Sequence, residues 1–191
     1  RDKKVILFIG GSQGAQKVNE IVLNSLVMLV SKFQVIHQCG QGQYNAVKAE
    51  MDRLIKEGQG HYAEAIQNNY KLFPFLDSQK YAAALAASDV VVSRAGAGSI
   101  SEIALAGQPA ILIPLSTHAS RGEQLTNAIE FAKYGAVYIE EENLNPNILI
   151  NQIETLLEPA KYQEVSQKIK TFASPDAADK IAATLLGQPA Q

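Results

Sequence analysis

The sequence is poor in the residues that build disulfides and metal centres. It contains one cysteine, no tryptophan and three histidines in 191 residues. A lone Cys39 cannot form an intramolecular disulfide and offers no cysteine cluster for structural zinc, which favours a reducing compartment. The histidines do not stand near carboxylates at metal-ligand spacing. We therefore expect neither a bound metal nor another cofactor.

An excess of positive charge and long apolar runs are also missing. Seventeen Lys and Arg residues face 19 Asp and Glu residues, a net charge of −2, so no nucleic acid is expected as a partner. No stretch approaches the roughly 20 apolar residues of a membrane span. The longest apolar segment, 21–30, is interrupted by Asn24 and Ser25 and is typical of a buried helix. No signal peptide opens the chain. It begins with Arg1 rather than methionine, so we expect part of a longer protein.

Apolar periodicity predicts strands that alternate with helices. Helices are expected at about 15–31, 45–56, 77–87, 99–107, 123–134 and 145–157, with two more beginning near 159 and 175. Strands are expected at 5–9, 33–38, 70–75, 89–94, 109–114 and 135–140. The polar segment 58–67 is expected to be a loop. This alternation predicts an α/β fold, with a doubly wound parallel six-stranded sheet covered by helices on both faces.

The middle of the chain contains the densest group of signals. Segment 89–94 is almost continuously apolar, as in a parallel strand buried on both faces. A glycine turn at 95–98 follows it. Ser99 and Glu102 have the spacing of a capping box at the start of a helix, and Gly107 is placed to end that helix. Such a turn lies at the carboxyl edge of a parallel sheet, where ligands bind.

The turn Gly10-Gly11-Ser12-Gln13-Gly14 between the first strand and helix has three interpretations. It could hold a phosphate through backbone N–H groups at a helix N-terminus, with the Ser12 hydroxyl as a further donor. It also satisfies the Gly-x-Ser-x-Gly elbow of serine hydrolases, although no earlier strand supplies their oxyanion loop. The third interpretation is a structural turn. A Walker A loop is excluded because no Gly-Lys-Ser/Thr follows. Gly96-Ala97-Gly98 lacks the third glycine of the dinucleotide fingerprint.

Several single residues keep two interpretations each. Glu102 is either a helix cap or a carboxylate that accepts the two hydroxyls of a ribose. Arg94 is either a buried ion-pair partner or faces an anionic ligand. His37, inside an apolar strand, is interpreted as a hydrogen-bonded core histidine, whereas His118 follows a strand end and is a weaker candidate for a site. The run 140–142 of three glutamates is interpreted as a solvated strand end.

Three motifs, at 10–15, 89–102 and 120–128, occur in an order and spacing that resembles one family. The chain resembles the carboxyl-terminal half of the MurG family, the N-acetylglucosaminyltransferases of peptidoglycan synthesis, and the likeness covers nearly all of it. These are inverting GT-B enzymes of two Rossmann-like domains. The resemblance implies that this half binds UDP-N-acetylglucosamine. The whole enzyme would transfer the sugar to undecaprenyl-diphospho-N-acetylmuramoyl-pentapeptide (lipid I), giving lipid II, as a peripheral protein on the cytoplasmic face of the membrane.

The same resemblance assigns the donor site. Ser12 and the amides of 11–14 would hold the diphosphate, Phe75 and the backbone of Leu76 the uracil, and Glu102 the ribose. Relatives carry Gln-Gln where this chain has Glu123 and Gln124, so the contact of Glu123 with the sugar is a departure from the pattern. The residues implied to bind the donor are Gly11, Ser12, Gln13, Gly14, Phe75, Leu76, Arg94, Gly96, Ala97, Glu102, Glu123 and Gln124.

The resemblance also implies what this chain leaves out. In the family the acceptor site, the membrane-binding surface and the catalytic base belong to the amino-terminal domain, so no catalytic residue is expected here, and the chain alone should bind donor weakly and transfer nothing. Residues 1–174 would form the donor domain, and the helix in 175–191 would pack on the missing domain. The alternatives are a stand-alone donor-binding subunit, as in the two-subunit dolichol-linked GlcNAc transferase, and a serine hydrolase that uses Ser12.

Overall fold

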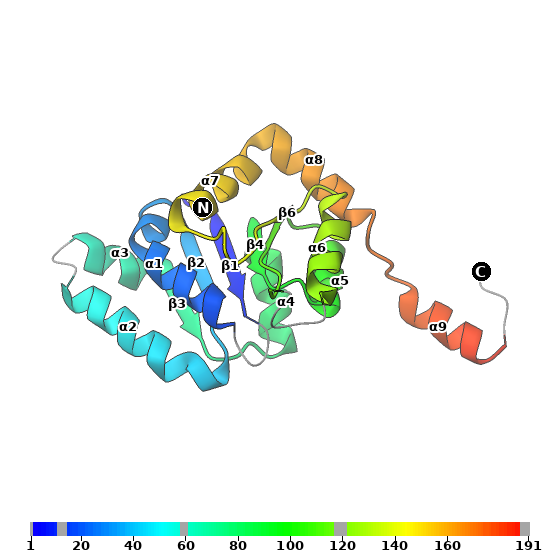
Figure 1. Ribbon diagram of the computed structural model, residues 1–191, viewed down its shortest axis with the longest axis horizontal. Coiled ribbons are helices and arrows are strands. Elements are labelled where there is room, and N and C mark those ends of the chain that lie inside the picture. The colour runs from blue at the N-terminus through cyan, green and yellow to red at the C-terminus, as the bar shows by residue number, and fades with distance from the viewer. Residues whose placement is uncertain (1, 11–14, 58–60, 117–121, 188–191) are drawn as a thin grey trace.

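The computed structural model describes residues 2–10, 15–57, 61–116 and 122–187, and its centre is one parallel sheet (Figure 1). The sheet has six strands in the order β3-β2-β1-β4-β5-β6, and every neighbouring pair is parallel. The strands are β1 Val5–Ile9, β2 Gln34–Gln38, β3 Tyr70–Phe73, β4 Val90–Ser93, β5 Ala110–Leu112 and β6 Val137–Tyr138. This confirms the predicted doubly wound α/β fold. The order reverses between β1 and β4, the place where such sheets bind ligands.

Helices cover both faces of the sheet. Helices α1 and α7 pack against each other on one face and α4 and α5 on the other, as right-handed crossovers require (Figure 1). The helices are α1 Gln16–Lys32, α2 Tyr44–Glu57, α3 His61–Asn69, α4 Ser78–Ala87, α5 Ala97–Ala106, α6 Glu123–Ala132, α7 Pro146–Leu157, α8 Pro159–Lys170 and α9 Ala177–Leu185, with a 3-10 turn η1 at Gln41–Gln43.

Predicted helix boundaries are confirmed where a capping residue sets them. The Asp77 carboxylate accepts a hydrogen bond of 2.9 Å from the Lys80 amide at the start of α4. Asn145 caps α7 in the same way and is followed by Pro146 at the first helical position. Gly107 ends α5 in a left-handed conformation, φ 67°, which a residue with a Cβ adopts only with strain.

Two predicted local structures are wrong. Segment 58–67 is not a loop throughout, because α3 begins at His61 and buries Ile66 in the core. The apolar spacing of Tyr62, Ala65 and Ile66 fits one helix face, and this pattern outweighs the polar composition. The capping box is also wrong: α5 starts at Ala97 with Gly96 as its cap and no side-chain cap bond. Ser99 therefore lies inside the first turn.

A chain of buried polar groups joins α1 to β2 and β3. The Tyr70 hydroxyl lies 2.6 Å from His37 Nδ1, and His37 Nε2 lies 2.9 Å from Asn19 Oδ1. The Asn19 amide nitrogen donates to the Cys39 carbonyl and to Gln43 Oε1. Because Asn19 presents its oxygen to the ring, His37 Nε2 donates and Nδ1 accepts from Tyr70. Burial lowers the pKa of His37 to about 3, which confirms a neutral core histidine.

Helix α9 stands apart from the sheet and its other helices (Figure 1). None of its residues is buried, and three large apolar side chains are exposed: Ile181 by 62%, Leu185 by 82% and Leu186 by 74%. An apolar stripe without a covering surface costs free energy in water. Among the helices described, none is both long enough and apolar enough to cross a membrane.

Candidate functional site

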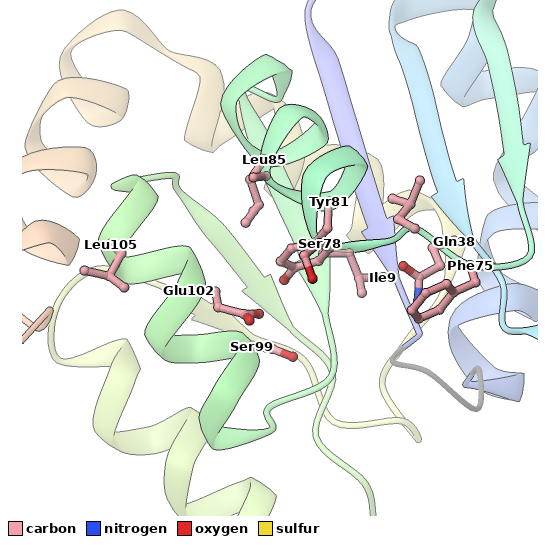
Figure 2. A pocket seen from close by; sticks show the side chains of 11 residues that line it. Ile9, Gln38, Phe75, Ser78, Tyr81, Leu85, Ser99, Glu102 and Leu105 are labelled. Atoms are coloured by element: carbon pink, nitrogen blue, oxygen red, sulfur yellow. The ribbon is translucent and has the colours of Figure 1, made fainter. Parts of the chain in front are cut away.

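A groove lies between α4 and α5 at the carboxyl edge of the sheet (Figure 2). Its floor is the ends of β1 and β2, its volume is about 540 Å³, and its walls are mainly apolar. The residues that line it are Ile9, Gln38, Phe75, Leu76, Ser78, Tyr81, Ala82, Leu85, Ser99, Glu102 and Leu105. A concave, mostly apolar groove with a few polar groups is the usual form of a small-molecule site.

Three predicted donor-binding residues meet in this groove. Phe75 follows β3 and leaves 53% of its surface in solvent, although its ring is large and apolar. The next side chain, Leu76, is buried, so only its backbone can contact a ligand. Glu102 projects from α5 toward the groove (Figure 2). The groove thus offers a flat apolar ring, backbone polar groups and a carboxylate to one ligand.

Tyr81 is a groove residue that the sequence prediction missed. Its hydroxyl is buried and makes no hydrogen bond of normal geometry with the described residues. Burial, and after it the neighbouring Glu102 carboxylate, raise the pKa of Tyr81, so the hydroxyl keeps its proton at neutral pH. The sequence offered one signal for it: Tyr81 is a large side chain on an otherwise alanine-rich helix, one turn after the cap Asp77.

The N-terminus of α5 leaves room for a close ligand. Gly96 is the cap and Ala97 the first helical residue, so the amides of this turn have no helical acceptor. A Cβ added at Gly98 would meet no atom within 4 Å, and one at Gly96 only Ser99 Oγ at 4.0 Å. The Asn127 side chain donates to the Ala95 carbonyl over 3.1 Å and so fixes the turn. An anion would be favoured here by the helix dipole.

Arg94 is engaged by protein groups just behind this turn. Its Nη2 lies 2.6 Å from Glu141 Oε1, and the two side chains are 12% and 17% exposed. Its Nη1 donates to the carbonyls of Ile113 and Pro114. Of the two interpretations, the ion pair is therefore present in the structure. The prediction that Glu141 belongs to a solvated strand end is wrong. Its side chain is only 17% exposed because the carboxylate pairs with Arg94, which follows β4.

Glu123 and Gln124 lie away from the groove, at the start of α6. Glu123 is exposed, and Gln124 Oε1 accepts a hydrogen bond of 3.1 Å from the Leu115 amide. Gln124 thus holds the segment after β5 against α6. A second hollow, of about 420 Å³, is lined there by Lys17, Pro114, Leu115, Ser116, Leu125 and Glu140–Glu142. The structure does not bring this pair onto the walls that carry Phe75 and Glu102.

The glycine turn after β1 falls partly outside the described residues. Gly11, Ser12, Gln13 and Gly14 belong to this part, as does His118. The residues on either side are described: the Gly10 amide donates to the Gln38 carbonyl over 3.2 Å, and α1 begins at Gln16. A helix N-terminus therefore follows the turn, as both the phosphate and the elbow interpretations require. Within the ranges described, no three His, Cys, Asp or Glu residues are grouped so that they could hold a metal.

Comparison of the sequence with known protein families shows which family the chain belongs to. The family "Glycosyltransferase family 28 C-terminal domain" matches residues 5–181. The chain belongs to this family. The described fold is therefore that of a family 28 carboxyl-terminal domain.

Two curated relatives share the name UDP-N-acetylglucosamine–N-acetylmuramyl-(pentapeptide) pyrophosphoryl-undecaprenol N-acetylglucosamine transferase. The protein of Legionella pneumophila strain Paris is 37% identical over 187 residues, 97% of this chain and 46% of the relative. That of Lachnoclostridium phytofermentans is 40% identical over 182 residues, 93% of this chain and 45% of the relative. The chain thus spans less than half the length of these relatives.

Solved structures agree with this assignment. The crystal structure of Acinetobacter baumannii MurG superimposes with a TM-score of 0.79 at 29% identity, over 98% of this chain and 51% of that one. The Neisseria meningitidis UDP-GlcNAc 2-epimerase, solved bound to UDP-GlcNAc, has a TM-score of 0.59 at 18% identity, over 98% and 45%. The second likeness shows the fold alone. The expected Rossmann-like half of a GT-B enzyme is confirmed.

Proposed function

We propose that the chain is the donor-binding half of a glycosyltransferase and binds UDP-N-acetylglucosamine in the groove between α4 and α5. The observation that carries this proposal is the meeting of Phe75, Leu76 and Glu102 on facing walls, beside the open N-terminus of α5. Membership of family 28 supports it, since the named relatives are N-acetylglucosamine transferases.

Each part of the nucleotide would meet a matching group. The uracil would lie on the exposed Phe75 ring and bond to the backbone of Leu76, while the Glu102 carboxylate would accept the two ribose hydroxyls. The diphosphate would then extend toward the amides of Gly96 and Ala97 and those of 11–14, with Ser12 as a further donor. Arg94 would line the nucleotide site from the end of β4, its guanidinium already held by Glu141.

The sugar would extend toward the start of α6. Gln124 would reach it there, and Glu123 beside it, where relatives carry glutamine. Gln124 also accepts from the Leu115 amide, which fixes its side chain before a ligand arrives. A prepositioned amide loses little freedom on binding and so adds affinity.

In the whole enzyme, catalysis would depend on positioning and on charge. As the anomeric C–O bond breaks with inversion, negative charge builds on the leaving diphosphate. Backbone amides at helix N-termini stabilise this charge without reorganising. Loss of one such well-aimed donor typically costs about 2.7–4 kcal/mol of transition-state stabilisation. The catalytic base, the lipid I site and the surface that binds the cytoplasmic face of the membrane would belong to the other half.

Helix α9 would complete the link between the halves. Its exposed Ile181, Leu185 and Leu186 form an apolar surface that the donor domain leaves uncovered. In the proposed division, residues 1–174 bind the donor and 175–191 pack on the amino-terminal domain. The stand-alone dolichol-type subunit is less well supported, because the relatives are single chains about twice as long. A serine hydrolase is likewise not favoured by membership of family 28.

The test is calorimetric titration of the chain with UDP-GlcNAc, UDP-glucose and GDP-mannose. We expect both uridine nucleotides to bind and GDP-mannose not to bind, because Phe75 and Leu76 would select the uracil base whichever sugar is attached. The matched variant is Phe75→Ala, which removes the exposed ring and should weaken both uridine ligands equally. Equal affinity for GDP-mannose, or no binding of any uridine nucleotide, would contradict the proposal.

A further inference from the structure

The side chain of Tyr81 lines the groove, and the proposed donor contacts do not use it. It comes from α4 and lies across the groove from Glu102 of α5 (Figure 2). Its backbone is fixed, since the Tyr81 amide donates to the Asp77 carbonyl over 2.8 Å within a capped first turn. The side chain is partly buried and packs against the hydrophobic core, so the ring has a defined place before any ligand binds.

Within the described ranges, the Tyr81 hydroxyl is buried without the hydrogen bond that a buried hydroxyl normally makes. It makes no hydrogen bond of normal geometry with the described residues, although the Glu102 carboxylate lies near enough to raise its pKa. Most buried hydroxyls in native proteins are hydrogen-bonded, so an exception needs an explanation. Leu85 and Leu105 also line this groove, and an apolar surrounding makes an unmade bond more costly and a formed bond stronger.

The Glu102 carboxylate is the polar group that can accept a hydrogen bond from the Tyr81 hydroxyl. Its proximity contributes, after burial, to the raised pKa of Tyr81, and a phenol that keeps its proton is a hydrogen-bond donor. A carboxylate has about four lone-pair sites, so it can accept two ribose hydroxyls and one phenol together. A glutamate on an exposed helix face otherwise has several rotamers, only some of which face the ribose.

We propose that Tyr81 is a specificity-determining residue for the ribose: its hydroxyl donates to the Glu102 carboxylate in the nucleotide complex and holds the rotamer that accepts both sugar hydroxyls. Tyr81 is thus a positioning residue that acts through Glu102. The inference rests on the proposed function, and it adds a second residue to recognition of the ribose.

The test is a double-mutant cycle read with two ligands. Wild type, Tyr81→Phe, Glu102→Gln and the double variant are titrated with UDP and with 2′-deoxy-UDP. Tyr81→Phe keeps the ring and should weaken UDP binding about two- to tenfold, the range of one hydrogen bond, and bring the two affinities closer together. In the Glu102→Gln background the same change should alter affinity by less than about twofold, because the charged acceptor is gone. Tyr62→Phe, on α3 and 52% exposed, is the matched control and should match wild type.

Thermal unfolding separates this role from a structural one. The hydroxyl makes no hydrogen bond of normal geometry within the described part of the chain, so Tyr81→Phe should leave the unfolding temperature unchanged or raise it. The inference is overturned if Tyr81→Phe keeps wild-type affinity and selectivity, or weakens binding equally with and without the Glu102 carboxylate. It is also overturned if both ligands are lost in parallel with stability. Failure of wild type to bind UDP would overturn the proposed function as well, whereas wild-type binding with an inert Tyr81 would overturn this inference alone.

Discussion

Two buried tyrosine hydroxyls, that of Tyr70 on β3 and that of Tyr81 on α4, differ in whether the protein supplies their hydrogen-bond partner. The Tyr70 hydroxyl lies 2.6 Å from His37 Nδ1 and belongs to a chain of bonds that ends within the protein. The Tyr81 hydroxyl makes no hydrogen bond of normal geometry with the described residues and lines a groove. Burial raises the pKa of both. Polar groups that stabilise the fold satisfy one another, whereas the Tyr81 hydroxyl is expected to gain its partner, the Glu102 carboxylate, only when a nucleotide is bound.

The largest expected effect is a loss of stability in acid, caused by the buried His37 that is hydrogen-bonded to Tyr70. Unfolded His37 titrates near its ordinary pKa, while in the folded chain its pKa lies at about 3. Below the ordinary value the unfolded state binds a proton that the folded state excludes, so acidification favours unfolding. Between pH 6 and pH 4 we expect His37 to lower the free energy of unfolding by about 1.4 kcal/mol per pH unit. Urea titrations of wild type and His37→Gln measure this; equal pH slopes in the two proteins would contradict it.

Glu102→Ala should produce the next largest effect, a loss of UDP affinity at the groove between α4 and α5. Removing the carboxylate proposed to accept the two ribose hydroxyls should weaken UDP binding by about 2–3 kcal/mol, the range for hydrogen bonds to a charged group. Discrimination against 2′-deoxy-UDP should largely disappear. Stability should change little, because Glu102 is exposed. Calorimetry gives the affinities, with Glu123→Ala at the start of α6 as a comparison that should not alter ribose selectivity.

Tyr70→Phe and Tyr81→Phe compare the two sides directly. The first leaves His37 Nδ1 buried without a donor and should cost about 2 kcal/mol of unfolding free energy. The second removes a hydroxyl that makes no hydrogen bond of normal geometry with the residues described, so it should cost less than about 0.5 kcal/mol. Urea denaturation measures both. A larger loss from Tyr81→Phe than from Tyr70→Phe would reverse the comparison.

Phe75→Ala should have a smaller effect than loss of the Glu102 carboxylate or of the Tyr70 hydroxyl. The ring is 53% exposed, so its loss should barely alter stability. Stacking of a base on an aromatic ring is worth about 1–3 kcal/mol, and one partly exposed ring should give about 1 kcal/mol. We expect about fivefold weaker UDP binding, with selectivity for the ribose retained because Glu102 and Tyr81 remain. Unchanged affinity would place the uracil elsewhere.

The fold could be predicted because its signals are local. Continuous apolar runs define the buried strands, and Asp77, Asn145 and Gly107 set helix ends through their own side chains or backbone freedom. The start of α5 was mispredicted because Gly96 can begin a helix without a side-chain cap, so the spacing of Ser99 and Glu102 was a misleading signal.

The site was only partly predictable because its contacts are long-range. The resemblance placed Phe75 and Glu102 among donor-binding residues, and the structure puts both in one groove. Tyr81 carried no motif, and its importance arises only where α4 faces α5 across the sheet edge. Glu141 was expected in solvent because nothing near it in sequence neutralises it. Its partner, Arg94, lies on another strand end.

A crystal structure of this chain with UDP would test the central claim most directly. The uracil should lie against Phe75, the ribose hydroxyls on the Glu102 carboxylate with the Tyr81 hydroxyl beside it, and the phosphates toward the start of α5. Density for the nucleotide outside the groove between α4 and α5, for example in the hollow bounded by Glu140–Glu142, would contradict the account.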